Sequence, residues 1–428
     1  MLCALACLAF TTQARADDSF PRTAGYLIGD PRNYQDAAYQ EKIAKLDVAI
    51  LGVWPGWEDT HGTTIEEVAK RIKAINPTTK VFIYFCPEST LYPPNPAFVD
   101  LAAKIDSQKW WLYQSGSGSS KVLSDFGRDT YILNLTNFAP ADSSGKRLNQ
   151  WLAQWVHDKN HKGNPTIDGT FTDNVFWKPR RNGDWNRDGS SDDQDNATVQ
   201  KWYREGFRTY LGTLKQLMPD KLHIGNIADW GHPDAVLTEY DQMMPGGIME
   251  AIVGKSYSPE AARGWSGMLS QYRKSMAALA APKLGIFHQF GEPSDYQSFR
   301  YGLATALLDD GYYAFTDNAD GYSGVPWFDE FDVKLGKAAS EPPKAAWQKG
   351  VWRRDFEHGI ALVNPRGNGT VEVTLERAFR RVAGKQDRTV NNGQTATKVT
   401  LRDRDGIVLL RMQRRPRAPN DVQISRTG

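Results

Sequence analysis

Asp173 stands where an apolar, β-prone run, residues 167–172, ends abruptly, and Asn174 and Trp177 follow it closely. A carboxylate at the C-terminal tip of a buried strand, beside an amide and an aromatic ring, is well placed to present an acid to a sugar. In parallel α/β barrels the strand tips converge on one mouth, where the chemistry takes place. We therefore predict that Asp173 is catalytic and that its partner carboxylate comes from another strand tip.

Glu250 is the predicted partner. Glycosidic cleavage generally uses two carboxyl groups, ~5–5.5 Å apart for retention and ~6.5–9.5 Å apart for inversion. Glu250 lies inside the apolar run 248–252, where a carboxylate is costly to bury without a purpose or a pairing. An apolar setting also raises a carboxyl pKa, which suits a general acid. The alternative is a structural ion pair, for example with an arginine.

Other side chains near predicted strand tips could hold sugar hydroxyls or stack on sugar rings. The amides could equally cap the helices that follow, and each Trp could pack on the barrel rim. For the two aspartates of this group, a loop cap or a bond to a substrate hydroxyl is favoured over catalysis. The predicted substrate-binding residues are Asn174, Trp177, Asn226, Asp229, Gln289, Asp317 and Trp54.

A loop after Asp173 has the spacing of a calcium site. Residues 184–195 read DWNRDGSSDDQD, with oxygen-bearing side chains and a Gly189 turn in the rhythm of a twelve-residue EF-hand-type loop. A structural Ca²⁺ ion would rigidify this loop; the alternative is a solvated acidic turn. The predicted ligands are Asp184, Asn186, Asp188, Ser190 through its backbone carbonyl, Asp192 and Asp195.

Eight short β-prone runs alternate with helical patterns and could position these residues. Helix-like stretches at 65–75, 198–218, 259–280 and 296–309 separate most of them, which predicts an α/β fold, a (β/α)₈ TIM barrel. A doubly wound sheet is the runner-up, but no glycine fingerprint follows the first strand. The predicted strands are residues 24–29, 48–54, 81–85, 169–173, 223–226, 248–252, 284–289 and 312–317.

Segments outside this alternation predict an excursion from the barrel, a second domain and a C-terminal tail. Residues 130–135 also resemble a strand, and we place them in a long excursion between the third and fourth strands; as a barrel strand they would shift the numbering by one. Four short runs after residue 345, at 358–364, 370–375, 396–401 and 407–412, predict a small antiparallel β-domain. The expected domains are a barrel over 20–340, a β-sandwich-like domain over 345–412, and a disordered basic tail over 413–428.

The N-terminus and the composition restrict location and partners. Residues 1–16 read as a secretory signal with an Ala14-Arg15-Ala16 cleavage pattern, so we expect a secreted or periplasmic bacterial protein; acylation at Cys7 is the less favoured alternative. The mature chain would keep one of three cysteines, Cys86, and thus no intrachain disulfide. A net charge of +2 argues against nucleic acid, and no later segment could span a bilayer. We expect a monomer.

Several ordered motifs together resemble a known family. IDGTFTDN, the DWNRDG loop, GNIAD, GGIMEAI and residues 300–315, RYGLATALLDDGYYAF, are similar to the TIM-barrel glycosidases grouped as hypothetical glycosyl hydrolase family 15, which are distinct from the glucoamylases. The resemblance spans about residues 23–317, and ALVNP and VTLRDRDGIVL extend it into the β-domain. It implies a secreted barrel enzyme that acts on a polysaccharide or oligosaccharide, with acidic residues at the strand ends.

Three functions remain open at this stage. The favoured one is a glycoside hydrolase that uses Asp173 and Glu250 in a two-carboxylate mechanism. The second is a non-catalytic carbohydrate-binding barrel, which would keep its strand-tip carboxylates too far apart to flank one bond. The third is another hydrolase or an isomerase on the same barrel, since fold alone does not fix chemistry.

Overall fold

Eight parallel strands form a closed barrel in the order β1-β10-β9-β8-β7-β6-β3-β2. The computed structural model describes residues 19–52, 62–94, 96–127, 129–237, 240 and 242–412. Each barrel strand overlaps one of the eight predicted runs, so the predicted TIM barrel is confirmed. The barrel strands are β1 (Thr23–Leu27), β2 (Val48–Leu51), β3 (Lys80–Phe85), β6 (Gly169–Thr172), β7 (Leu222–Asn226), β8 (Gly246–Val253), β9 (Leu284–Gly291) and β10 (Tyr312–Asp317).

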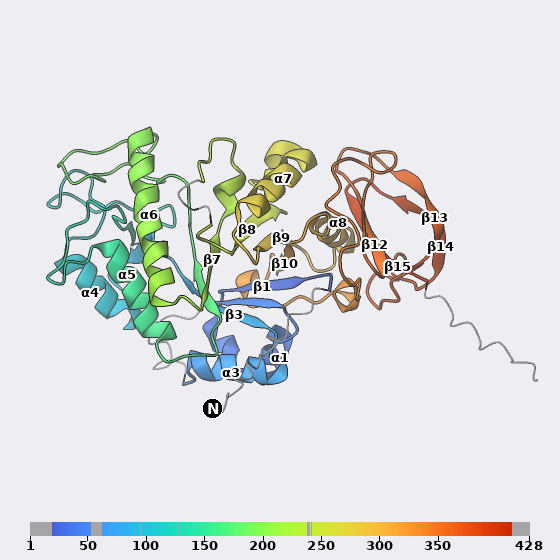
Figure 1. Ribbon diagram of the computed structural model, residues 1–428, viewed down its shortest axis with the longest axis horizontal. Coiled ribbons are helices and arrows are strands. Elements are labelled where there is room, and N and C mark those ends of the chain that lie inside the picture. The colour runs from blue at the N-terminus through green and yellow to red at the C-terminus, as the bar shows by residue number, and fades with distance from the viewer. Residues whose placement is uncertain are drawn as a thin grey trace, which may run out of the picture.

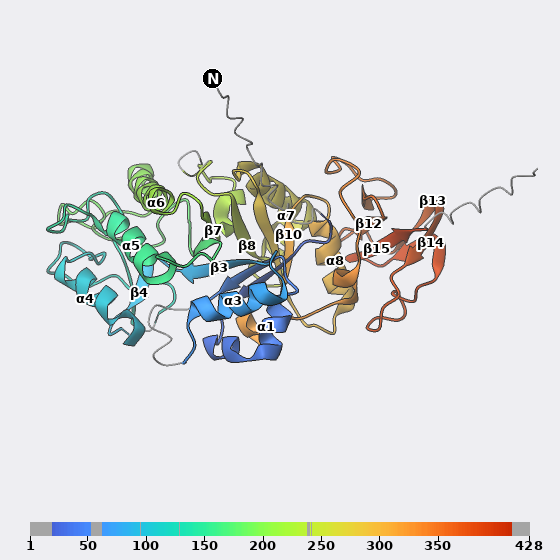
Figure 2. The ribbon, with the colours of Figure 1, turned by 60° about the horizontal axis from the view of Figure 1, so that its bottom comes forward.

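Helices connect most of these strands. α3 starts at a capping box, in which Thr64 and Glu67 bond each other's backbone N–H groups, and Figure 2 shows α1 and α3 side by side on one face of the barrel. Between β7 and β8, the described residues include a short 3-10 turn, η4 (Ala228–Gly231), and no α-helix. The α-helices are α1 (Ala37–Ile43), α3 (Ile65–Ile75), α4 (Val99–Ser107), α5 (Leu148–Val156), α6 (Ala197–Leu217), α7 (Pro259–Ala278) and α8 (Tyr296–Ala306).

Short helical turns complete the connections. α1 and α4 were not predicted, because seven and nine residues give too few turns for a clear apolar periodicity. The short turns other than η4 are η1 (Pro31–Gln35), η2 (Pro96–Phe98), the π-turn η3 (His157–His161), η5 (Gly321–Ser323) and η6 (Asp329–Asp332).

Alternation along the strands decides which side chains enter the barrel. Phe171, Ile224 and Ile248 belong to the apolar cluster inside the barrel. Because side chains of a strand point to opposite faces in turn, the residues two positions further along β6, β7 and β8 point inward at the mouth. Those residues are Asp173, Asn226 and Glu250.

The excursion between β3 and β6 stands outside the barrel. β5 (Thr130–Ile132) pairs with β4 (Ser89–Leu91) in a separate two-stranded antiparallel sheet. The placement of residues 130–135 in an excursion, rather than in the barrel, is therefore confirmed.

The C-terminal strands form a five-stranded antiparallel sheet in the order β11-β12-β15-β13-β14. β13 pairs with both β14 and β15 and is irregular between Thr374 and Phe379, so the sheet bends there and encloses its own apolar core. β11 was not predicted, because its WRRD sequence lacks apolar alternation. The strands are β11 (Trp352–Asp355), β12 (Gly359–Asn364), β13 (Val371–Arg381), β14 (Thr395–Leu401) and β15 (Asp405–Arg411).

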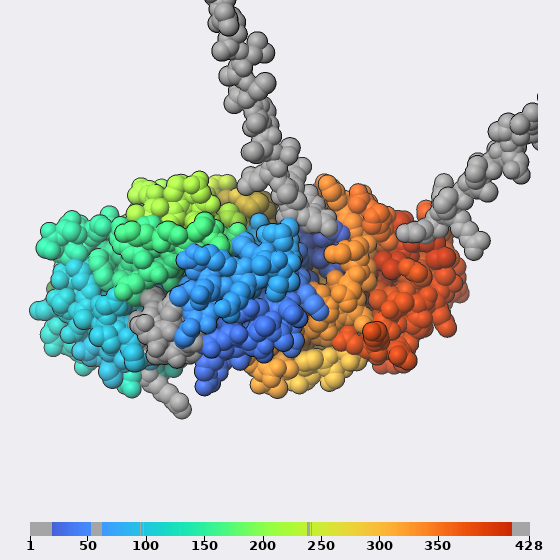
Figure 3. Space-filling view, turned by 90° about the horizontal axis from the view of Figure 1, so that it is seen from below, coloured from blue at the N-terminus to red at the C-terminus, as the bar shows by residue number. Residues whose placement is uncertain are grey.

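The molecule is elongated, with the barrel between its two appendages. The excursion occupies one end and the β-domain the other (Figures 1 and 3). Among the described helices, none combines the length and the apolar composition that a membrane crossing requires. The predicted signal at 1–16, the tail at 413–428 and Trp54 lie outside the described residues.

Candidate active site

One amide joins the two predicted catalytic carboxylates. Asn226 Nδ2 donates to Asp173 Oδ1 at 3.1 Å and to Glu250 Oε2 at 2.7 Å. The two accepting oxygens can be no farther apart than the sum of these distances, which is below about 6 Å, so the two carboxyl groups are close enough to flank one glycosidic bond. The structure therefore brings Asp173, Glu250 and Asn226 into one cluster at the barrel mouth.

Asp173 is buried but supplied with hydrogen-bond donors. The Tyr84 hydroxyl donates to Oδ2 at 2.6 Å, and the backbone N–H of Asn174 donates to Oδ1 at 2.9 Å. Burial raises the pKa of the Asp173 carboxyl, while the bonds from Tyr84, Asn226 and Asn174 act in the opposite direction. These donors stabilise the carboxylate form of a side chain that is only 7% exposed.

Glu250 has fewer donors and a charged neighbour. The Tyr322 hydroxyl, from η5, donates to Oε1. Burial is the largest cause that raises the pKa of Glu250, the negative charge of Asp173 raises it further, and the bonds from Tyr322 and Asn226 oppose both. β8 is irregular between Met249 and Val253, and Ala251 has a φ of 52°. The strand is thus distorted at the residue after Glu250.

A third carboxylate, Glu88, contacts the residue that follows Asp173. Glu88 is 2% exposed and accepts from Asn174 Nδ2 at 2.7 Å. Arg180 donates to both oxygens of Glu88, at 3.1 and 2.7 Å. Asn174 itself has a left-handed backbone with a φ of 55°. The chain from Arg180 through Glu88 to Asn174 therefore fixes the peptide N–H that bonds Asp173.

The carboxylates open into a cavity of about 540 Å³. Tyr26 and Tyr322 line it with their rings 5.1 Å apart, and the Tyr26 ring packs at 5.2 Å on Phe171 of the barrel core. Residues of the excursion, among them Leu91 and Phe126, form another part of the wall. Apolar surface beside two carboxylates suits a sugar, because one face of a pyranose ring is apolar while its hydroxyls are polar.

The prediction that Gln289 binds substrate is wrong. The side chain is fully buried; its amide donates to Ser298, and its carbonyl oxygen accepts from the Tyr313 hydroxyl at 2.9 Å. Ile286 and His288 point into the barrel, so alternation turns Gln289 outward under α8.

Of the predicted substrate-binding residues, Asn174 lines the cavity, whereas Trp177, Asn226, Asp229 and Asp317 are not among the described residues that line it. Trp177 is 8% exposed and stacks on His232 at 5.7 Å. Asp229 lies in η4, where burial raises the pKa of its carboxyl. Asp317 accepts from the backbone N–H of Ala319 at 2.8 Å, which is the loop cap that the sequence offered as its alternative.

The predicted calcium loop shows two buried side-chain oxygens without a hydrogen-bond partner, Asp184 Oδ1 and Gln194 Oε1. Asp184 is 1% exposed, and its Oδ1 has no hydrogen-bond partner, while Oδ2 accepts from the N–H groups of Gly116 and Gly189. Asp195, however, pairs with Lys178. In the part of the chain that the structure describes, no group of three or more His, Cys, Asp or Glu side chains is arranged to hold a metal. The residues thus fit a cation at Asp184 better than around the whole loop.

Several residues of the cluster were not predicted from the sequence. Glu88 follows β3 in CPEST and is an acidic residue near a strand tip, so the argument that selected Asp173 could have found it. Tyr26 and Tyr84 lie on the inward face of their strands, close to the mouth. The alternation of side chains along a strand could have predicted this position. Tyr322 arrives from a turn after β10, and no local pattern indicates its contact with Glu250.

Comparisons with known proteins find one matching family and several distantly similar solved structures. A model of the family described as hypothetical glycosyl hydrolase family 15 matches residues 73–360. Among solved structures, the glycoside hydrolase domain of PelA from Pseudomonas aeruginosa is 14% identical, with a TM-score of 0.44 over 72% of this chain and 98% of that one. An alpha-amylase from Anoxybacillus is 12% identical, with a TM-score of 0.47 over 92% and 98%. No curated protein matches this chain.

Proposed function

This chain belongs to hypothetical glycosyl hydrolase family 15 and is a glycosidase, and from that premise we propose that Asp173 and Glu250 cleave a polysaccharide or oligosaccharide with retention of configuration. The observation that carries the proposal is the Asn226 amide that contacts both carboxylates. Carboxyl groups this close suit direct attack on the sugar rather than attack through an interposed water.

The surroundings of the two carboxylates favour different roles. Asp173 accepts from three donors, Tyr84, Asn226 and the backbone of Asn174, which suits a nucleophile that must be ionised. Glu250 is half-buried beside the negative charge of Asp173, which raises its pKa and suits a group that must hold a proton. Unequal environments of paired carboxyls are a common basis for dividing acid and nucleophile roles.

The proposed reaction has two steps. An oxygen of Asp173 attacks the anomeric carbon while Glu250 gives its proton to the departing glycosidic oxygen, which forms a glycosyl–enzyme ester and releases the first product. Glu250, now ionised, takes a proton from a water that attacks the same carbon and frees Asp173. The proton returns to Glu250, so each turnover consumes one water.

The geometry weighs against a non-catalytic carbohydrate-binding barrel. That function predicts strand-tip carboxylates too far apart to flank one bond, whereas Asp173 and Glu250 share a single donor. It would also give no reason to bury Asp173 and half-bury Glu250 in one hydrogen-bonded cluster, because an unused buried charge is costly.

Screening against bacterial exopolysaccharides and cell-wall glycans provides a substrate, and two variants then test the mechanism. Asp173→Asn should lower kcat by roughly 10³-fold or more, about 4 kcal/mol of transition-state stabilisation. Glu250→Gln should lose much less activity on substrates with acidic leaving groups, which need no protonation. An exposed control, Asp220→Asn, should retain the wild-type rate. Near-wild-type turnover by Asp173→Asn, or an inverted product, would refute the proposed mechanism.

We further propose that a structural Ca²⁺ ion binds the 184–195 loop through Asp184 and its neighbours. The support is the motif spacing together with the buried, unpartnered Asp184 Oδ1. Removal of calcium with EDTA should lower the melting temperature, and added Ca²⁺ should restore it. Asp184→Asn should reduce this response. An EDTA treatment that leaves the melting temperature unchanged would exclude the ion.

We also propose that the protein is exported. The support is the apolar stretch and small-residue cleavage pattern of residues 1–16. Expression of the full chain in a bacterial host, followed by N-terminal sequencing of the extracytoplasmic fraction, should give a mature chain that begins at Asp17. An uncleaved chain retained in the cytoplasm would contradict export.

A further inference from the structure

The β-domain carries a hollow far from the barrel mouth. Its volume is about 730 Å³, and residues of the segment before β11, of β11 and of β13 line it. β13 lies at the end of the molecule away from the excursion (Figure 1). The two catalytic carboxylates do not contribute to this hollow, so the proposed mechanism leaves it unexplained.

Arg353 is held rigidly at its centre. Its guanidinium bonds Asp355 at 2.9 and 2.8 Å and Glu376 at 2.7 and 2.9 Å. The Arg353 side chain is only 11% exposed, whereas those of Asp355 and Glu376 are 29% and 41% exposed. The arginine therefore positions two carboxylates whose remaining lone pairs face solvent and can accept hydroxyl hydrogens.

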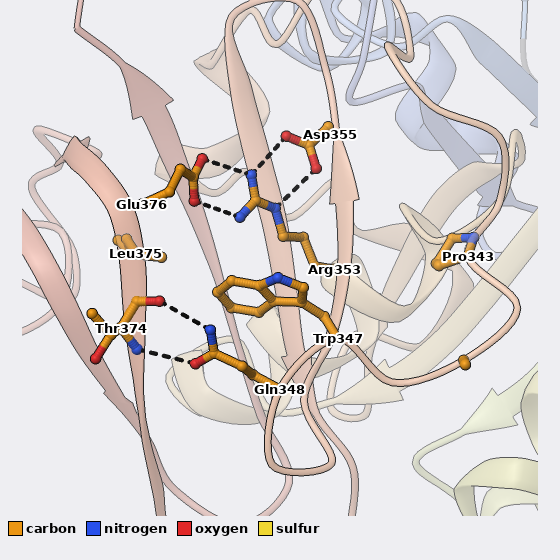
Figure 4. Close-up of a pocket in the computed structure, with 9 residues that line it drawn as sticks. Pro343, Trp347, Gln348, Arg353, Asp355, Thr374, Leu375 and Glu376 are labelled. Carbon is orange, nitrogen blue, oxygen red and sulfur yellow. Dashed lines mark hydrogen bonds and ion pairs between the residues drawn. The ribbon is translucent and has the colours of Figure 1, made fainter.

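An aromatic ring and an amide adjoin this cluster. The guanidinium carbon of Arg353 lies 4.9 Å from the centroid of the half-buried Trp347 ring. Gln348 is fixed by two 3.3 Å bonds to the backbone of Thr374. Figure 4 shows the guanidinium between Glu376 and Asp355, with Trp347 beside it and Gln348 next in line. An indole with planar polar groups held around it matches a sugar, which offers an apolar face and a rim of hydroxyls.

The charges at the hollow balance one another. Arg411 also donates to Asp355, at 2.8 Å, so two guanidinium groups face two carboxylates. The bond from Arg353 lowers the pKa of Glu376 to about 2, which keeps it ionised and accepting. A further arginine, Arg377, approaches Glu376 only to 3.9 Å from an exposed position. A site without a large net charge favours a neutral ligand over an anionic one.

We propose that this hollow is an accessory binding site for a neutral glycan, with Trp347 as the stacking surface and Asp355, Glu376 and Gln348 as hydroxyl partners. The inference takes from the proposed function only that the ligand is a carbohydrate. Its role is to keep the enzyme on a polymer while the barrel mouth acts on the chain, which raises the local substrate concentration.

The test uses the full-length Asp173→Asn protein in native gels that contain dextran, laminarin, galactomannan or amylopectin. Retardation by at least one polymer is expected, and it should persist in 0.5 M NaCl because no net charge drives it. Adding Trp347→Ala should weaken the apparent affinity about tenfold. Adding Trp202→Ala, a half-buried Trp on α6 far from the β-domain, should leave it unchanged.

A second variant protects the test against misfolding. Trp347 packs on the β-domain core, so its removal could unfold the domain, which the melting temperature would reveal. Glu376→Gln keeps the side-chain shape at an exposed position and should weaken binding severalfold. Retardation by none of the four polymers, or equal retardation of a folded Trp347→Ala or Glu376→Gln protein, would overturn the site. Neither result bears on hydrolysis by Asp173 and Glu250, which the catalytic variants test separately.

Discussion

Asp173 is buried at the barrel mouth, and its burial should cost the fold stability at neutral pH. Its pKa in the folded protein is raised above the unfolded value of about 3.9. Between those two values the folded state keeps a proton that the unfolded state has released, so stability falls as pH rises through that window. Above the folded pKa the penalty is complete.

Asp173→Asn should therefore raise the melting temperature. The gain over the wild type should be absent below about pH 4, where both states are protonated, and should grow as pH rises above that value. Thermal melts of both proteins from pH 3.5 to 8 measure the difference. Asp220→Asn, at an exposed position, should follow the wild type. A gain that does not change with pH would mean that ionisation of Asp173 is not its cause.

Tyr322 should influence the pH above which kcat/KM falls on the alkaline side of the activity profile. Its hydroxyl donates to Glu250 and lowers the pKa of that carboxyl against the effect of burial. Tyr322→Phe removes the donor, so Glu250 should hold its proton to higher pH. The alkaline limb of kcat/KM should then move upward, since the general acid acts in its protonated form.

A nearby tyrosine provides the control for this shift. Tyr257 is 71% exposed, and Tyr257→Phe should leave the limb in place. A downward shift, or none, in Tyr322→Phe would show that this hydroxyl does not tune Glu250 and would weaken the assignment of Glu250 as the acid.

At the scale of elements, a buried ion pair joins the segment after β6 to the start of the excursion and supports the mouth. Arg180, in the segment between β6 and α6, bonds both oxygens of Glu88, which is 2% exposed and follows β3. Arg180→Met would leave a buried carboxylate without its cation, at a cost of about 3–5 kcal/mol in the free energy of unfolding. It should also lower kcat, because Glu88 orients Asn174 and the N–H that bonds Asp173.

A double-mutant cycle separates the cost of leaving the Glu88 charge unpaired from the other consequences of losing Arg180. Adding Glu88→Gln to Arg180→Met removes the buried charge and should restore most of the stability in denaturant unfolding. Arg181→Met is a matched control, because Arg181 pairs with Asp125 at an exposed site, and such pairs contribute about 0–1 kcal/mol. Equal losses in Arg180→Met and Arg181→Met would argue against a special role for Glu88.

The sequence predicted the elements better than the contacts between them. Strand alternation and helical periodicity are local, so the eight barrel strands and the position of Asp173 could be read from neighbouring residues. The error at Gln289 arose because strand ends are uncertain by a residue or two, and a shift of one residue moves a side chain from the mouth to the helix layer. The bond from Tyr322 to Glu250 joins residues far apart in the chain, and no local pattern encodes it.

At the scale of the whole molecule, the β-domain packs against the barrel through a shared helix, α8. α8 lies between the barrel and the C-terminal sheet (Figure 1), and its residues from Ser298 to Ala306 are all buried. Arg300 of α8 bonds the Gly406 carbonyl at 3.2 Å and pairs with Asp387 at 2.6 Å. One face of α8 therefore packs on the barrel, and the other face packs on the β-domain.

A chain that ends at Glu341 should consequently fail to fold cooperatively. Its α8 would expose the apolar surface that β12 and β15 cover, at about 25 cal/mol per Å², and would leave Arg300 without its partners. A chain that ends at Met412 keeps the contacts described above and should melt like the full-length protein. Circular dichroism melts of both truncations decide the matter. A single sharp transition near the full-length melting temperature for the shorter chain would mean that the barrel is an independent folding unit and that the β-domain serves binding alone.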